Sequence, residues 1–372
     1  MRQKTTTICY LANADNYHTY KWASQFSLRG YGVHVLSLEE CRAEAIRELK
    51  NVTVHYLQNP SARQGSELQK LGYLSTVGVA RRLIEELDPD VVHAHYASSY
   101  GLVASLACRR PYYLSVWGSD VYDFPRKSPL HRAVVRRSLA KPAWLMSTSR
   151  AMAEECAKYT GRDFEITPFG VDMGLFSPRK REPHEGLVVG TVKALERKYG
   201  IDTPLRGCAL LHDRRPDLGV RVRIAGKGTM EAELKALATR LGMDGYLDWL
   251  GFIPQEEAAR EWAGLDIAIV ESESESESFG VSAVEAQASG TPLIISDIPG
   301  LMEACDGGHT AVVTPRRDPA ALADALEALA NDPARRARMG AEGRAYVERA
   351  YEVGACFDRV EEIYRRNMEE AR

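Results

Sequence analysis

Two glutamates, Glu277 and Glu285, lie eight positions apart around the segment Ser-Phe-Gly-Val-Ser-Ala-Val. The segment predicts a helix that starts near Gly280 and stops at Gly290. Backbone N–H groups at a helix N-terminus bind phosphates, and carboxylates accept hydrogen bonds from sugar hydroxyls. The residue types and their spacing therefore predict a site for a sugar diphosphate, although two exposed glutamates on a loop and helix can produce the same spacing.

The segment follows a run of alternating glutamate and serine, residues 271–278, which we call the Glu–Ser loop. Of its glutamates, only Glu277 has a carboxylate partner eight residues later. We therefore predict that Glu271, Glu273 and Glu275 form a solvated acidic loop.

Two lysines, Lys193 and Lys198, come directly after a predicted strand at residues 187–192. The carboxyl end of a strand is the usual ligand edge of a doubly wound sheet, so this position favours a functional role over that of ordinary surface lysines.

Polar residues follow strands in the N-terminal half as well. His93 and His95 lie two apart on one strand and hence on one face, where His93 is expected near the core and His95 toward a cleft. His18 follows the first strand at the same edge. Asp120 either orients an acceptor or caps a helix.

Strands and helices alternate almost throughout the chain, which predicts an α/β protein with parallel sheets. A segment rich in proline and charge at residues 177–185 interrupts the alternation and is typical of a linker. We expect two Rossmann-like domains across a cleft, residues 1–178 and 179–350, and a final helix, residues 351–372, that returns to the first domain. The first strand is not followed by G-x-G-x-x-G, which argues against a nicotinamide dehydrogenase.

Composition narrows the functional classes. The 372 residues carry a formal net charge of −3, so no basic field indicates nucleic acid, and no apolar run is long enough to span a bilayer. The seven cysteines are scattered singly, which favours reduced thiols in a cytoplasmic enzyme and no cysteine metal site. The N-terminus lacks a signal-peptide pattern. The basic stretch at residues 126–141 is expected to be a solvated helix face, with contact to anionic lipid as the alternative.

Four blocks together resemble the retaining, nucleotide-sugar-dependent glycosyltransferases of family four, which have the GT-B fold. The blocks are residues 168–172, 190–202, 224–229 and 277–292. Several positions depart from the pattern that many members share. Lys193 stands where an arginine is usual, Lys227 where an acidic residue is common, and Phe169 where an asparagine is usual. Residues 14–22 replace a double-glycine loop, and Trp117 stands where a histidine is common.

The resemblance implies a role for each matching residue. Glu277 contacts the donor sugar and Glu285 the nucleotide ribose. Lys193 and Lys198 match an arginine–lysine pair that neutralises the diphosphate. The remaining donor-binding residues are the backbone groups of Phe279, Gly280 and Val281, with Gly226 and Gly228 near the nucleotide. We predict Lys193, Lys198, Glu277 and His95 as catalytic, and His18 and Asp120 as acceptor-side residues.

The resemblance also implies the reaction. A sugar passes from a nucleoside diphosphate to a hydroxyl of a saccharide, a lipid-linked molecule or a small molecule, without metal or cofactor and with retained anomeric configuration. By analogy with the family, we expect a role in the biosynthesis of cell-surface polysaccharide or glycoconjugates. We expect the protein in the cytoplasm, with peripheral contact at the inner face of the membrane as a variant. A nucleotide-sugar epimerase, an inverting enzyme and a non-catalytic nucleotide-sugar-binding protein remain the alternatives.

Overall fold

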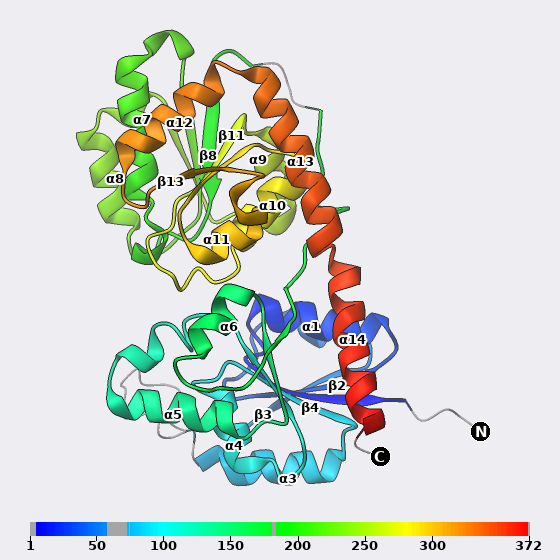
Figure 1. Ribbon diagram of the computed structural model, residues 1–372. Coiled ribbons are helices and arrows are strands. Elements are labelled where there is room, and N and C mark those ends of the chain that lie inside the picture. Colours follow the sequence, from blue (N-terminus) through cyan, green and yellow to red (C-terminus); the bar gives the residue numbers. More distant parts are fainter. Residues whose placement is uncertain (1–4, 58–72, 74, 181–183, 371–372) are drawn as a thin grey trace. The chain divides into compact units, whose positions relative to one another are not determined.

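The computed structural model describes residues 5–57, 73, 75–180 and 184–370. The chain forms two compact units, Met1–Pro168 together with Phe357–Arg372, and Phe169–Cys356. Each unit contains a parallel sheet with helices on both faces (Figure 1). The predicted α/β architecture with two Rossmann-like halves is confirmed. Of the predicted linker, residues 181–183 lie outside the described part.

In the first unit the described residues form a seven-stranded sheet in the order β3-β2-β1-β4-β5-β6-β7. Its strands are β1 (Thr7–Leu11), β2 (Gly32–Ser37), β3 (Val52–Tyr56), β4 (Val91–His95), β5 (Tyr113–Val116), β6 (Trp144–Ser147) and β7 (Glu165–Ile166). Its helices are α1 (Tyr17–Leu28), α2 (Glu44–Arg47), α3 (Val77–Leu87), α4 (Tyr100–Ala107), η2 (Phe124–Arg126), α5 (Pro129–Ala140), α6 (Arg150–Cys156) and α14 (Val353–Glu370).

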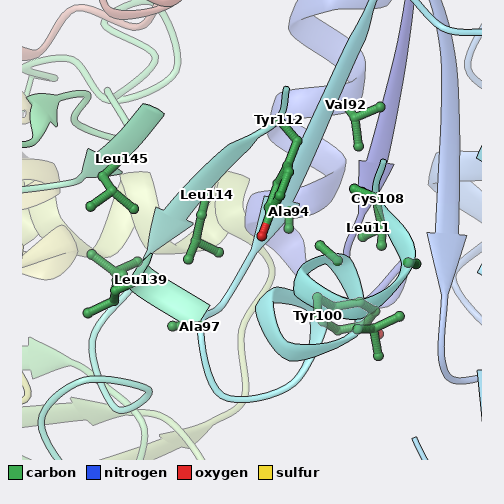
Figure 2. Packing of buried hydrophobic residues seen from close by; sticks show 14 of the residues in the cluster. Leu11, Val92, Ala94, Ala97, Tyr100, Cys108, Tyr112, Leu114, Leu139 and Leu145 are labelled. Atoms are coloured by element: carbon green, nitrogen blue, oxygen red, sulfur yellow. The ribbon is translucent and has the colours of Figure 1, made fainter. Parts of the chain in front are cut away.

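Alternation along β1 and β4 assigns side chains to the two faces of this sheet. Leu11, Val92 and Ala94 point into an apolar cluster with residues of α3, α4 and α5 (Figure 2). Intervening residues such as Tyr10 and His93 pack instead against α1 and α14. The sheet is therefore buried on both sides, as expected for parallel strands.

The last helix, α14, packs on the first sheet beside α1. Trp22 and Phe26 of α1 contact Phe357 and Tyr364 of α14 through their rings. At the helix surface, Arg29 Nη2 lies 2.6 Å from Asp358 Oδ1. The predicted return of the final helix to the first domain is confirmed.

In the second unit the described residues form a six-stranded sheet in the order β10-β9-β8-β11-β12-β13. Its strands are β8 (Val188–Val192), β9 (Arg221–Ala225), β10 (Leu247–Gly251), β11 (Ile267–Val270), β12 (Leu293–Ser296) and β13 (Val312–Thr314). Its longer helices are α7 (Asp202–Arg214), α8 (Glu231–Arg240), α9 (Gln255–Gly264), α10 (Val281–Ala288), α11 (Pro299–Ala304), α12 (Pro319–Ala330) and α13 (Pro333–Tyr351). Short turns of helix are η3 (Arg197–Tyr199), η4 (Pro216–Leu218), η5 (Met243–Gly245) and η6 (Asp306–Gly308).

Helices α7, α8 and α12 bury leucines on one face of the second sheet. Helix α10 packs against α13, where a Cβ on Gly340 would lie 2.2 Å from the Gly290 carbonyl oxygen. A larger residue at position 340 would separate the two helices, so this glycine allows α13 to pack closely against the end of α10. Across the described part of the chain, no helix is both long and apolar enough to cross a membrane.

Candidate functional site

The carboxyl edge of the second sheet gathers most of the predicted donor residues. Lys193 follows β8, Gly226 follows β9, and the Glu–Ser loop connects β11 to α10. Because all strands of this sheet are parallel, these segments emerge at the same edge.

Lys193 and Glu277 form an ion pair at this edge, with Nζ 2.6 Å from Oε2 and side chains only 10% and 8% exposed. Burial disfavours the charged ammonium, but the attraction of Glu277, Tyr199 and Glu285 outweighs it and raises the pKa of Lys193. Lys193 therefore stays cationic in a partly dry environment, where charge interactions are stronger than in water.

Lys198 lies in η3, close to Lys193 in space. The ammonium groups of Lys193 and Lys198 lie 4.3 and 4.8 Å from the centre of the Tyr199 ring. The structure thus brings the two predicted diphosphate-binding lysines to one aromatic ring.

Gly226 and Gly228 allow the loop after β9 to approach the loop after β8. A Cβ on Gly226 would lie 1.9 Å from the Lys193 carbonyl oxygen, and one on Gly228 would lie 2.3 Å from that of Leu195. Their closest neighbours are thus backbone atoms. The two glycines therefore fix the backbone that carries Lys193.

Helix α10 begins at Val281 after Gly280, whose positive φ of 72° suits glycine. Phe279 is 5% exposed and its ring packs on Tyr351, so its side chain serves the core beside the helix start. Ser282 Oγ donates to the Val192 carbonyl oxygen at 3.0 Å, which ties the helix start to the end of β8. The N-terminus of α10 is thereby held at the ligand edge.

Glu285 lies one turn further along α10 and is half-buried. Its Oε2 accepts a hydrogen bond of 3.4 Å from Trp262 Nε1 of α9. Glu285 also contributes to the raised pKa of Lys193. Both glutamates of the eight-residue spacing thus interact electrostatically with the same lysine.

The prediction of a solvated Glu–Ser loop is wrong for Glu271 and Glu273. Glu271 is 3% exposed, accepts a 2.5 Å hydrogen bond from Thr314 Oγ1, and has a pKa that burial raises to about 7. The side chain of Glu273 is only 17% exposed, whereas that of Glu275 is 43% exposed. Sequence reasoning missed Glu271 and Glu273 because a run of alternating glutamate and serine resembles solvated filler, whatever loops cover it in the fold.

In the first unit, His95 ends β4 and is 1% exposed. Its ring lies 4.6 Å from that of Trp117 and 4.9 Å from that of Trp22. Neither ring nitrogen has a hydrogen-bond partner among the described residues, and burial lowers the pKa of His95 to about 3. His95 is thus a neutral imidazole in an aromatic setting.

His93 has the core role that we predicted. It is fully buried and its ring nitrogens lie 2.8 Å from Ser115 Oγ and 2.5 Å from Tyr364 Oη. His18 lies near the start of α1, 5.8 Å from the Trp117 ring, and burial lowers its pKa to about 3. The rings of two predicted N-terminal site residues, His18 and His95, therefore both contact the Trp117 ring.

Asp120 is fully buried and accepts hydrogen bonds from the backbone N–H groups of Ala97, Trp117 and Gly118 at 2.7, 3.2 and 2.8 Å. Burial raises its pKa to about 6 against the effect of these donors. Its carboxylate shapes the turns after β4 and β5, as in the capping alternative, and has no exposed oxygen with which to orient an acceptor directly.

No cluster of three or more potential metal ligands occurs among the residues that the structure describes.

Comparison with known proteins shows which family the chain belongs to. Residues 7–149 match the family model described as "Glycosyl transferase 4-like", and residues 174–346 match "Glycosyl transferases group 1". The D-inositol 3-phosphate glycosyltransferase of Arthrobacter sp. (strain FB24) is 34% identical over 68% of this chain and 64% of its own length. That of Corynebacterium jeikeium (strain K411) is 30% identical over 69% and 67%. A third, from Pseudarthrobacter chlorophenolicus, is 34% identical over 57% and 52%. The chain thus spans about half to two thirds of these relatives.

Solved structures share the fold. Sucrose-phosphate synthase from Thermosynechococcus elongatus superposes with a TM-score of 0.84 at 17% identity, covering 98% of this chain and 100% of that one. Anabaena Alr3699/HepE in complex with UDP gives 0.79 at 17% identity, covering 96% and 99%. The predicted GT-B fold is confirmed. By its two matching domains and its relatives, the chain belongs to the glycosyltransferase family.

Proposed function

We propose that this protein is a retaining glycosyltransferase that moves a sugar from a nucleoside-diphosphate sugar to a hydroxyl acceptor. One observation carries the proposal. The buried Lys193–Glu277 pair and Lys198 gather around Tyr199, at the edge where α10 begins. This edge offers cations and helix N–H groups to a diphosphate and carboxylates to the hydroxyls of a sugar and a ribose.

The reaction breaks the bond between the anomeric carbon and the phosphate oxygen, and its electron pair goes to the leaving nucleoside diphosphate. Lys193, Lys198 and the first N–H groups of α10 stabilise the charge that develops there. The acceptor oxygen bonds to the anomeric carbon on the same face, and its proton passes to the departing phosphate. Because the lysines neutralise the leaving group, we propose that transfer needs no metal ion and persists in EDTA.

Phe252, which the sequence analysis did not select, extends this site toward a nucleobase. It follows β10 at the same edge and is 73% exposed. Gly251 accepts a 2.6 Å hydrogen bond through its carbonyl oxygen from the N–H of Gly226, so the two loops are adjacent. We propose that the Phe252 ring stacks on the base, a contact worth about 1–3 kcal/mol in nucleic-acid complexes.

The comparisons suggest which substrates to test first. UDP is bound in several structures of the same fold, and several relatives are named for inositol 3-phosphate. We therefore propose a uridine donor and a small phosphorylated or saccharide acceptor, with lipid-linked acceptors and a role in polysaccharide synthesis as broader options.

A thermal-shift screen of UDP-, GDP- and ADP-sugars tests donor binding, because a bound ligand stabilises the fold by mass action. Wild-type protein should be stabilised by one nucleotide class, and Phe252→Ala less so. Incubation of that donor with inositol 3-phosphate, followed by NMR of the product, tests transfer and the retained configuration. Epimerised donor without acceptor would support an epimerase instead, and binding without transfer or hydrolysis would support a non-catalytic binding protein.

A further inference from the structure

Glu273 has contacts that a solvated residue of an acidic loop would lack. Its backbone N–H donates to the Lys198 carbonyl oxygen at 3.0 Å, and that of Ser274 donates to the same oxygen at 3.3 Å. The Glu–Ser loop, which carries Glu277, is thus hydrogen-bonded directly to the residue that we expect to bind the diphosphate.

Gly200 fixes the same contact from the other side. Its φ of 54° lies in the left-handed region, and a Cβ there would lie 2.7 Å from Glu273 Cγ and 3.0 Å from the Glu271 carbonyl oxygen. The side chain of Glu273 therefore occupies the space beside the Lys198 turn, and only glycine leaves room for it.

The carboxylate of Glu273 has a partner from a third segment. Arg317, in the turn between β13 and α12, places Nη2 2.7 Å from Glu273 Oε2. Arg317 also has a left-handed backbone, with φ of 62°, which is uncommon for a residue other than glycine. Its neighbour Arg316 pairs with Asp297 at 3.0 Å, so the turn is anchored independently of Glu273.

We propose that Glu273 is a positioning residue that holds the Glu–Ser loop against the Lys198 turn, and that Arg317 keeps the Glu273 carboxylate in place. Through this contact, Lys198 and Glu277 keep a fixed separation although they come from different strands. The effect on ligand binding rests on the proposed function, whereas the contact itself does not.

Hydrogen–deuterium exchange of the full chain tests the contact, because the N–H groups of Glu273 and Ser274 donate hydrogen bonds to the Lys198 carbonyl oxygen. In Arg317→Ala their exchange should be about fivefold faster, the scale of losing a strong exposed ion pair. Arg317→Lys, which keeps the charge, should stay within about twofold of wild type. Gly200→Ala should accelerate exchange by about tenfold or more, because it strains the left-handed turn and displaces Glu273.

Arg214→Ala serves as the matched control. It removes a 2.6 Å pair with Asp324 elsewhere in the second unit, with side chains 43% and 69% exposed. Exchange at residues 273 and 274 should not change, and urea unfolding should show that Arg317→Ala retains global stability. Unchanged exchange in both Arg317→Ala and Gly200→Ala would overturn the positioning role.

UDP binding, measured by calorimetry, adds the functional readout. Arg317→Ala should bind UDP about threefold to fivefold more weakly than wild type, and Arg317→Lys and Arg214→Ala should bind it normally. If exchange responds as expected but wild-type protein binds no nucleoside diphosphate, the positioning contact stands and the proposed function fails.

Discussion

Lys193 Nζ lies 2.6 Å from Glu277 Oε2, although the two residues are 84 positions apart in the chain. Lys193 comes from the end of β8 and Glu277 from the loop after β11, which are neighbouring strands of the sheet. Both side chains are about nine-tenths buried. The pair therefore stabilises the fold as well as forming part of the proposed site, and we expect a mutation of either residue to affect both stability and activity.

A comparison of Lys193→Met with the double variant Lys193→Met/Glu277→Gln should separate these two effects. Removing one partner of a buried pair leaves an uncompensated charge and costs about 3–5 kcal/mol. We expect a loss of that order in the free energy of unfolding, measured with urea, together with loss of transfer. The double variant Lys193→Met/Glu277→Gln should recover stability but not activity. Recovery of transfer in the double variant would show that the pair is purely structural.

Glu285→Ala should weaken donor binding by about 10- to 100-fold, the cost of losing a hydrogen bond that a ligand hydroxyl donates to a charged carboxylate. Calorimetry with the donor that the thermal-shift screen selects measures this change. Glu257→Ala, which removes an exposed glutamate from α9, is the control and should bind normally. If Glu285→Ala keeps wild-type affinity, Glu285 is not part of the site.

Lys198→Ala should slow transfer by about 10²–10³-fold, because we propose that this lysine stabilises the charge that develops in the transition state. Steady-state rates at saturating donor report this loss as a fall in kcat. Lys235→Ala, which removes a lysine paired with Glu231 on α8, is the control. A near-normal kcat in Lys198→Ala would exclude Lys198 from the chemistry.

His95 should make stability depend on pH. Its pKa is about 3 in the folded state against 6.5 in the unfolded chain, because burial disfavours the imidazolium. The unfolded state therefore binds the proton first, and stability falls as pH drops below about 6.5 until both states are protonated near 3. At pH 5, His95 alone should lower the free energy of unfolding by about 2 kcal/mol relative to neutral pH.

His95→Phe should flatten this dependence. Urea unfolding of wild type and His95→Phe at pH 7 and pH 5 gives the difference directly, because other titrating groups such as Asp120 are shared by both proteins. Equal losses in the two proteins between pH 7 and pH 5 would contradict the assignment of a neutral, buried His95.

Much of this arrangement is visible in the sequence. The helix at Val77–Leu87 and the strand at Val91–His95 are defined by local signals, namely apolar periodicity and the Asp88-Pro89 pair between them. The start of α10 at Val281 also follows from local signals, namely Gly280 before it and Gly290 beyond its end. Local chemistry was sufficient in each case.

Contacts between distant segments were less predictable. Nothing near Glu271 in the sequence indicates that Thr314 of β13 will bury it, and nothing near Asp120 indicates that it will accept the N–H of Ala97. The Arg317–Glu273 pair likewise depends on the order of β11, β12 and β13 in the sheet. Such burial is a property of tertiary packing, which single-sequence patterns do not encode.

A crystal structure of the protein with its nucleotide-sugar donor tests the central claim most directly. The account predicts that the diphosphate lies at the N-terminus of α10, within hydrogen-bond distance of the Gly280 and Val281 N–H groups and of Lys198 Nζ. A diphosphate bound elsewhere, with these groups left in contact with solvent, would contradict it.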